Sequence, residues 1–223
     1  MSKEITTKPH VLVNFLQDFS GSMEHGWFET ASGFKTFVDM LKSKEDVEYV
    51  FSLTLFNTSV DKSIIGRPIA SIDSGLLSGL RPTGGTALFD ALAETINDTR
   101  KNALEADKVI FVVVTDGEEN SSRVWTKEAL HSLVDAELAA GKTTFQYLGT
   151  QPESWEGSAQ IGIAMRDTVQ YDANHTVAMY SCVGDALNNF AADKSLRSTR
   201  SMTQTYASES NIAAANLKFD PQV

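Results

Sequence analysis

Three short segments of the sequence bring carboxylate and hydroxyl side chains close together along the chain. They read Asp18-Phe-Ser20-Gly-Ser22, Thr83-Gly-Gly-Thr86 and Thr115-Asp116-Gly117. In an extended turn, alternate residues point to the same side, so the polar side chains of the first segment can converge. The three segments contain no His and no Cys, so the chemistry that they offer is that of oxygen ligands.

Five residues of these segments form a candidate metal site: Asp18, Ser20, Ser22, Thr86 and Asp116. Hard cations bind oxygen ligands of this kind, whereas zinc and copper favour sites that include nitrogen or sulfur. Two carboxylates and three hydroxyls leave room for water, which suits Mg²⁺, with Mn²⁺ or Ca²⁺ as alternatives. If one carboxylate reaches the ion only through water, the ion stays electrophilic, and an open coordination position would attract a carboxylate from outside.

The hydrophobic pattern predicts the elements that must position these segments. Residues 11–16 and 108–115 are apolar runs typical of buried strands, and each leads into one of the segments. After residue 86, strand and helix patterns alternate, which favours a parallel sheet with right-handed crossovers. Ligands of such a sheet bind where loops leave the carboxyl ends of strands, so we expect the first and third segments at one edge. Further strands are predicted at 47–56, 60–65, 143–148 and 168–171, and helices at 27–42, 87–104, 127–140, 155–163 and 175–192, with a short one near 74–77.

Together the three segments resemble the metal-ion-dependent adhesion site (MIDAS) of von Willebrand factor type A domains. Asp18-x-Ser20-x-Ser22 resembles the opening motif of that family, and Pro-Thr-Gly-Gly-Thr86-Ala-Leu, with Asp90 shortly after, resembles its threonine motif. Thr115-Asp116-Gly117 looks like the third motif, which completes the set. The order of elements agrees from residue 10 to about 192. The disulfide-free chain is more similar to compact stand-alone bacterial or phage members than to extracellular adhesins.

The resemblance implies a fold and a function. The fold would be a Rossmann-like three-layer α/β sandwich, with a six-stranded, mostly parallel sheet and residues 60–65 as its one antiparallel edge strand. The hydroxyls of Ser20, Ser22 and Thr86 would bind the ion. Asp18 and Asp116 would bind it directly or through water, and an Asp or Glu of a protein partner would complete the coordination. The function would then be non-enzymatic protein interaction through a Mg²⁺-type ion.

Other interpretations of the same residues stay open. Asp18, Ser20 and Ser22 are also typical of a turn or a helix N-cap, and Gly84-Gly85 of a simple turn. The chain could be an assembly protein that self-associates through its C-terminal tail, with the ion only bracing loops. A metal-dependent hydrolase is a further alternative, but no His is tied to the site. Only Glu118 or Glu119 could serve as a general base there, and both are expected on a solvated loop rim together with Asn120.

Composition limits the partners and the location. Lys and Arg total 19 against 29 Asp and Glu, and the formal net charge of −10 argues against nucleic-acid partners. The single cysteine, Cys182, excludes an internal disulfide and a thiolate zinc cage, and indicates an intracellular protein. The N-terminus lacks a signal-peptide pattern, and the longest apolar run, 109–114, is too short to span a bilayer. We therefore expect a cytoplasmic protein without membrane contact.

The composition changes near the C-terminus. Beyond residue 194, Ser and Thr are frequent and apolar residues are few. We expect an N-terminal lead at 1–9, one domain at 10–194 and a Ser/Thr-rich tail at 195–223. The tail is interpreted either as a flexible segment or as an arm that docks on a partner. The oligomeric state and the identity of the partner do not follow from the sequence.

Overall fold

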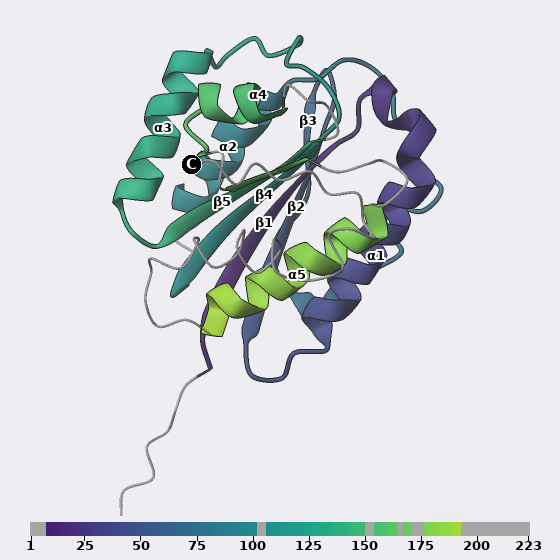
Figure 1. The fold of residues 1–223 in the computed structure, drawn as a ribbon, viewed down its shortest axis with the longest axis vertical. Helices are drawn as coiled ribbons and strands as arrows, with labels where there is room; N and C mark the ends of the chain where they lie inside the picture. The colour runs from purple at the N-terminus through teal and green to yellow at the C-terminus, as the bar shows by residue number, and fades with distance from the viewer. Residues whose placement is uncertain (1–7, 102–105, 150–153, 165–166, 171–175, 193–223) are drawn as a thin grey trace, which may run out of the picture.

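A six-stranded sheet with helices on both faces forms the described part of the chain (Figure 1). The computed structural model describes residues 8–101, 106–149, 154–164, 167–170 and 176–192. The strands are β1 (His10–Asp18), β2 (Glu48–Phe56), β3 (Val60–Pro68), β4 (Lys108–Thr115), β5 (Thr143–Gly149) and β6 (Thr168–Gln170). The helices are α1 (Trp27–Lys42), α2 (Leu88–Lys101), α3 (Lys127–Ala139), α4 (Ser154–Gln160) and α5 (Thr176–Ala192), with 3₁₀ helices η1 (Gly21–Gly26) and η2 (Ile69–Ser71). The predicted tail from residue 195 and most of the predicted lead lie outside the described residues.

The strand order is β3-β2-β1-β4-β5-β6, and β3 alone runs antiparallel to its neighbour. The predicted fold class, with one antiparallel edge strand, is therefore confirmed. The two apolar runs noted in the sequence, β1 and β4, are adjacent at the centre. Their register pairs Gln17 with Val114, so Asp18 and Thr115 end neighbouring strands at the same edge of the sheet. This is the edge at which the sequence predicts the site.

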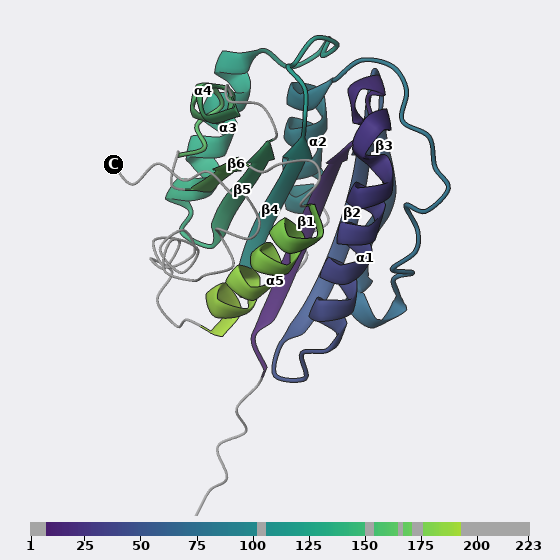
Figure 2. The same ribbon diagram turned by 45° about the vertical axis from the view of Figure 1, so that its right-hand side comes forward.

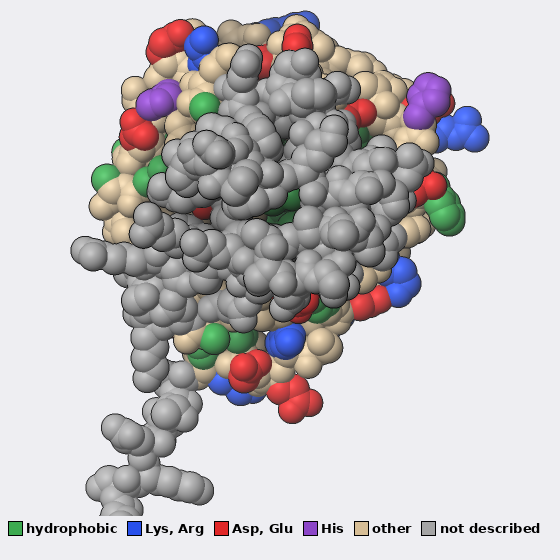
Figure 3. Space-filling view, viewed as in Figure 1, with side chains coloured by type: hydrophobic (Ala, Val, Ile, Leu, Met, Phe, Trp, Pro, Cys, Tyr) green, Lys and Arg blue, Asp and Glu red, His purple; other side chains and the backbone are tan. Residues whose placement is uncertain are grey.

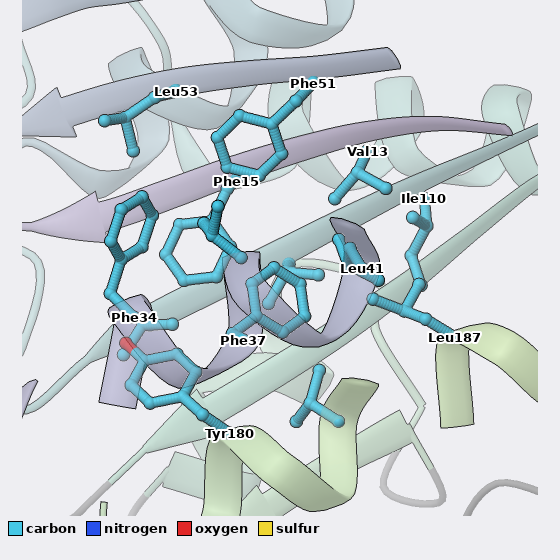
Figure 4. Close-up of a cluster of buried hydrophobic side chains, with 14 of the residues drawn as sticks. Val13, Phe15, Phe34, Phe37, Leu41, Phe51, Leu53, Ile110, Tyr180 and Leu187 are labelled. Carbon is cyan, nitrogen blue, oxygen red and sulfur yellow. The ribbon is translucent and has the colours of Figure 1, made fainter. Parts of the chain in front are cut away.

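Successive side chains of β1 point to opposite faces of the sheet, and each face carries a hydrophobic core. Helices α1 and α5 cover one face, and α2 and α3 cover the other (Figure 2). On the α1/α5 face, the Phe15 ring lies 5.4 Å from Phe34, 5.3 Å from Phe37 and 5.8 Å from Tyr180 between centroids (Figure 4). On the other face, Leu16 joins the second core. Because both faces of β1 are buried, the end of this strand is held rigidly, and with it the start of the first polar segment.

The segment between β3 and α2 differs from the prediction. No helix forms near residues 74–77, which make turns instead, and the short helix η2 lies earlier. The Asp73 carboxylate accepts a hydrogen bond from the Gly75 N–H, a local turn that competes with a helix. Gly79 adopts a left-handed φ of 81°, which also interrupts helical geometry. The carbonyl of Leu77 accepts a bond from the indole N–H of buried Trp27, which fixes the segment against α1.

Helix α5 ends beside the starts of the central strands. The Lys108 ammonium, at the first residue of β4, donates to the carbonyl of Phe190 and lies 4.7 Å from the centre of its ring. The His10 N–H, at the first residue of β1, donates to the Asp107 carboxylate at 2.9 Å. The last turn of α5 and the start of β1 therefore lie at the edge opposite the carboxyl ends of β1 and β4. None of the helices described is long and apolar enough to span a bilayer.

Candidate metal centre

The first polar segment turns sharply where β1 ends. Asp18 is fully buried, and its Oδ1 accepts a hydrogen bond from the Ser20 N–H at 2.7 Å. This turn brings the hydroxyl oxygens of Ser20 and Ser22 to 3.0 Å from each other. Ser20 stands at the N-cap of η1, but its side chain makes no capping hydrogen bond. Helix capping therefore does not account for the hydroxyls of this segment.

The third segment closes on the first because β1 and β4 are neighbours. The Ser22 hydroxyl donates to Asp116 Oδ1 at 2.6 Å, and the Thr115 hydroxyl donates to Asp18 Oδ2 at 2.6 Å. The paired residues are 94 and 97 positions apart in the sequence. The carboxylates of Asp18 and Asp116 and the hydroxyls of Ser20, Ser22 and Thr115 are thus linked by hydrogen bonds at this edge of the sheet.

The second segment joins this group through its backbone and through Thr86. The Gly21 N–H donates to the Gly84 carbonyl at 3.0 Å, which fastens the second segment to the first. A methyl group placed on Gly117 would lie 3.3 Å from Thr86 Oγ1, 3.4 Å from Ser22 Oγ and 4.0 Å from Asp18 Oδ2. Oxygens of the first and second segments therefore converge beside Gly117 of the third segment, and Asp116 joins them through its bond from Ser22. The structure thus brings together the five residues that the sequence singled out.

Neighbouring side chains approach Gly84 and Gly85 too closely for a Cβ atom at either position. Gly84 has a left-handed φ of 84°, and a Cβ there would lie 2.7 Å from Thr58 Oγ1. A Cβ on Gly85 would lie 2.5 Å from Asn120 Oδ1. The backbone here is pressed between the turn after β2 and the loop after β4, so Gly84-Gly85 is more than a simple turn.

The two carboxylates of the group lack a compensating positive charge. Burial raises the pKa of Asp18 from 3.8 to about 6, against the opposing effect of its bonds from Thr115 and Ser20. Burial also raises the pKa of Asp116. None of the ion pairs in the described ranges involves either side chain. A divalent cation among these oxygens would supply the missing charge, so the residues fit a metal ion.

The donor set fits a hard cation. Among the residues with described positions, no three or more His, Cys, Asp or Glu side chains gather in a way that could hold a metal. A metal would depend here on the hydroxyls of Ser20, Ser22 and Thr86 together with two carboxylates. That composition corresponds to Mg²⁺ or Mn²⁺ with some coordinated water.

Two acidic residues that sequence reasoning did not place in the site hold its loops. The buried carboxylate of Asp90, in the first turn of α2, accepts backbone N–H bonds from Arg123 at 2.8 Å, Val124 at 3.1 Å and Trp125 at 2.8 Å. Asp90 follows Thr86 by four residues, and this acid in a first helical turn was the available sequence signal.

Glu119 fixes the other part of the same loop. It accepts bonds from the N–H groups of Ser121, Ser122 and Phe89 and from the Ser122 hydroxyl, at 2.7–2.9 Å. The expectation of a solvated rim is confirmed for Glu118 and Asn120, which are exposed. It is wrong for Glu119, which is half-buried and accepts these four bonds. Because four donors occupy the Glu119 carboxylate, it is poorly suited to act as a general base.

Three exposed apolar side chains lie close in sequence to the polar segments. Phe28, in the first turn of α1, is 79% exposed, and Val124, in the loop after β4, is 75% exposed. Leu80 is also exposed and lies three residues before Thr83. In the view of Figure 3, acidic and basic side chains alternate around the periphery of the molecule, where the residues are described.

Comparison with known proteins identifies the fold through solved structures. No family model and no curated protein matches the chain. Proximal thread matrix protein 1 (PTMP1) from the mussel byssus is 18% identical, with a TM-score of 0.60 over 79% of this chain and 46% of that chain. Manganese-loaded Plasmodium vivax TRAP protein is 19% identical, with a TM-score of 0.57 over 76% of this chain and 71% of that chain. A von Willebrand factor type A structure from Catenulispora acidiphila is 16% identical, with a TM-score of 0.56 over 80% of this chain and 42% of that chain.

These likenesses concern the fold. The chain spans less than half the length of the mussel protein and of the Catenulispora protein. The shared part is the α/β sandwich, with its mostly parallel six-stranded sheet. The chain therefore has the von Willebrand factor type A fold.

Proposed function

We propose that this von Willebrand factor type A fold is a non-enzymatic interaction module that binds a carboxylate of a protein partner through a Mg²⁺-type ion. The ion would be held by Asp18, Ser20, Ser22, Thr86 and Asp116. The observation that carries the proposal is the convergence of oxygens from Asp18, Ser22 and Thr86 beside Gly117, with Asp116 joined to them through Ser22. Asp18 is buried and Asp116 is half-buried. When bound, the ion would supply an electrophilic coordination position for an external oxygen.

Two structures with a similar fold contain a divalent metal, which supports the proposal. One PTMP1 structure has a zinc-occupied MIDAS motif, and the Plasmodium TRAP structure is manganese-loaded. The choice of Mg²⁺ for this chain rests on its own donor set, which contains no nitrogen or sulfur ligand.

A protein partner could also use exposed apolar side chains close in sequence to the polar segments. Exposed Phe28 and Val124 offer apolar area on elements that flank the oxygens. Apolar surface that forms a contiguous patch is typical of sites that contact proteins, whereas single exposed apolar residues are common on any protein. A partner segment could place an Asp or Glu on the ion and cover these side chains at the same time.

Thermal unfolding in EDTA, Mg²⁺, Mn²⁺ and Ca²⁺ tests the metal site. At a hundredfold excess over Kd, a ligand of the native state adds about 2.7 kcal/mol, which raises the Tm of a domain of this size by roughly 5–10 °C. We expect this rise in the wild type and in Asp61→Asn, an exposed control in β3, and its loss in Asp18→Asn. No rise in the wild type with any of the ions would contradict the proposal.

A second measurement separates partner binding from the alternative in which the ion only braces loops. With Mn²⁺ bound, the peptide acetyl-Gly-Asp-Gly-amide should change the electron paramagnetic resonance spectrum of the ion, because its carboxylate enters the coordination sphere. The matched peptide with Asn in place of Asp should not. An unchanged spectrum with both peptides would favour the bracing role. Removal of residues 197–223, followed by mass measurement in solution, tests self-association through the tail.

A further inference from the structure

Asn120 holds the backbone of Thr86 on both sides. The Thr86 N–H donates to Asn120 Oδ1 at 2.9 Å. The Thr86 carbonyl accepts from the N–H groups of Asn120 at 3.0 Å and Ser121 at 3.1 Å. The donor and the acceptor of the Thr86 backbone are thus both bound by the loop after β4. The position of the Thr86 hydroxyl therefore depends on where that loop lies.

The Asn120 side chain is itself fixed in place. Its Oδ1 accepts a second hydrogen bond, from the Ser121 hydroxyl at 2.7 Å. It also occupies the space above Gly85, where a Cβ would lie 2.5 Å from Asn120 Oδ1 and 2.2 Å from Ser121 Oγ. The absence of a side chain at Gly85 is what allows the amide to reach Thr86. The need for glycine at position 85 thus supports the position of the Asn120 amide by packing as well as by its hydrogen bonds.

The loop that carries Asn120 cannot shift freely against α2. The neighbouring Glu119 carboxylate accepts the N–H of Phe89, in the first turn of α2, at 2.9 Å, and also the N–H groups of Ser121 and Ser122. The same loop begins at Asp116. Thr86 is therefore hydrogen-bonded to the loop that begins at Asp116, although the two residues come from different segments.

We propose that Asn120 is a positioning residue, which sets the Thr86 hydroxyl against Asp116 and the first segment so that the oxygens suit a divalent cation. This inference rests on the proposed metal function. Asn120 does not contact the ion in this proposal; it acts through Thr86. Residues that orient metal ligands commonly change metal affinity by 10–100-fold when they are mutated.

The test compares Asn120→Ala with Asn120→Asp, which keeps an acceptor for the Thr86 N–H. Mn²⁺ affinity is measured by electron paramagnetic resonance, and urea unfolding in EDTA reports the metal-free stability. We expect Asn120→Ala to bind Mn²⁺ about tenfold more weakly or worse. Asn120→Asp should bind at least as tightly as the wild type, because it keeps the acceptor and adds a negative charge. Gly85→Ala, which displaces the same amide from the opposite side, should weaken binding as Asn120→Ala does. Asn97→Ala, on α2, is the control and should bind as the wild type does.

Hydrogen exchange of the Thr86 amide in EDTA provides a readout without metal. Exchange should be faster in Asn120→Ala than in Asn120→Asp, because only the latter keeps the acceptor. If the wild type binds Mn²⁺ and Asn120→Ala binds it equally well, the positioning role is refuted while the metal site stands. If both variants lose affinity together with metal-free stability, Asn120 serves folding alone. If the wild type binds no Mn²⁺, the proposed metal function fails, and the positioning role fails with it.

Discussion

The Thr115 hydroxyl donates a hydrogen bond to Asp18 Oδ2 at 2.6 Å, across the boundary between the two central strands. The other carboxylate oxygen of Asp18 accepts the Ser20 N–H at 2.7 Å. The orientation of the carboxylate is therefore set from two sides before any ligand binds. Both donors are neutral, so they orient the carboxylate without supplying a positive charge.

The metal-free protein should lose stability as pH rises from about 4 to about 6. Burial raises the pKa of Asp18 from 3.8 in the unfolded chain to about 6 in the fold, so the folded protein holds more protons between these values. The contribution is fully present below about pH 4 and is lost as pH passes about 6, an effect of about 3 kcal/mol. Asp116, whose pKa is also raised by burial, acts in the same direction.

Urea unfolding in EDTA across this pH range, for wild type and Asp18→Asn, measures the effect. Asparagine does not titrate, so the variant takes up no proton at position 18 in either the folded or the unfolded state. The difference between the two free energies of unfolding should therefore change between about pH 4 and about pH 6 and be constant above about pH 7. A difference that stays constant throughout would show that Asp18 titrates as an ordinary carboxyl.

Gly117→Ala should block the metal without removing a ligand. The added methyl would stand among the oxygens of Thr86, Ser22 and Asp18, at 3.3, 3.4 and 4.0 Å. Gly117 does not have a positive φ, so the backbone accepts alanine. We expect the Tm in EDTA to change little and the rise in Tm with Mg²⁺ or Mn²⁺ to be lost.

Gly21→Ala, in the first segment, is the matched control for Gly117→Ala. Its methyl would make an ordinary contact of 3.5 Å with the Gly84 carbonyl, away from the converging oxygens. The metal-dependent rise in Tm should survive in this variant. A full rise in Gly117→Ala would mean that the ion does not lie beside residue 117.

Asp90→Asn should destabilise the fold by about 1.5–3 kcal/mol, the range for hydrogen bonds to charged groups. The carboxylate accepts three consecutive backbone N–H groups with two oxygens, whereas an amide offers one acceptor and turns its NH₂ toward the donors. Urea unfolding gives the change, with exposed Asp135→Asn in α3 as the control. A loss below about 0.5 kcal/mol, typical of surface changes, would mean that the loop is not held through Asp90.

Tyr180→Phe should cost more stability than Tyr49→Phe. The Tyr180 hydroxyl donates to Oε1 of Gln17, which is fully buried, whereas Tyr49 donates to half-buried Asn188. Water can replace the lost donor more readily at Asn188, so about 1–3 kcal/mol is expected for Tyr180→Phe and less for Tyr49→Phe. Chemical denaturation of both variants checks the order, and the reverse order would contradict the argument.

The fold could be predicted because its signals are local. The apolar runs of β1 and β4 and the helical period of α1 follow from burial alone, and each agrees with the predicted range to within two residues at either end. The short helix predicted near 74–77 was wrong, because the turn at Asp73 and the glycines there compete with helix formation.

The five candidate ligands could be found from sequence because each belongs to a short segment with a recognisable composition. The roles of Asp90, Glu119 and Asn120 could not, since each acts on backbone groups 30 or more residues away. A side chain that binds a distant backbone group leaves no periodicity in the sequence. Whether the five residues bind a metal stays a prediction.

The contact between Lys108 and Phe190 shows which elements lie at the end of the molecule opposite the converging oxygens. The first residue of β1 and the last turn of α5 lie together at one pole, and the converging oxygens lie at the other. A tether attached near residue 8 or residue 192 would therefore leave the protein on the side opposite the converging oxygens. In a module anchored in this way, the pole that carries the converging oxygens faces away from the point of attachment.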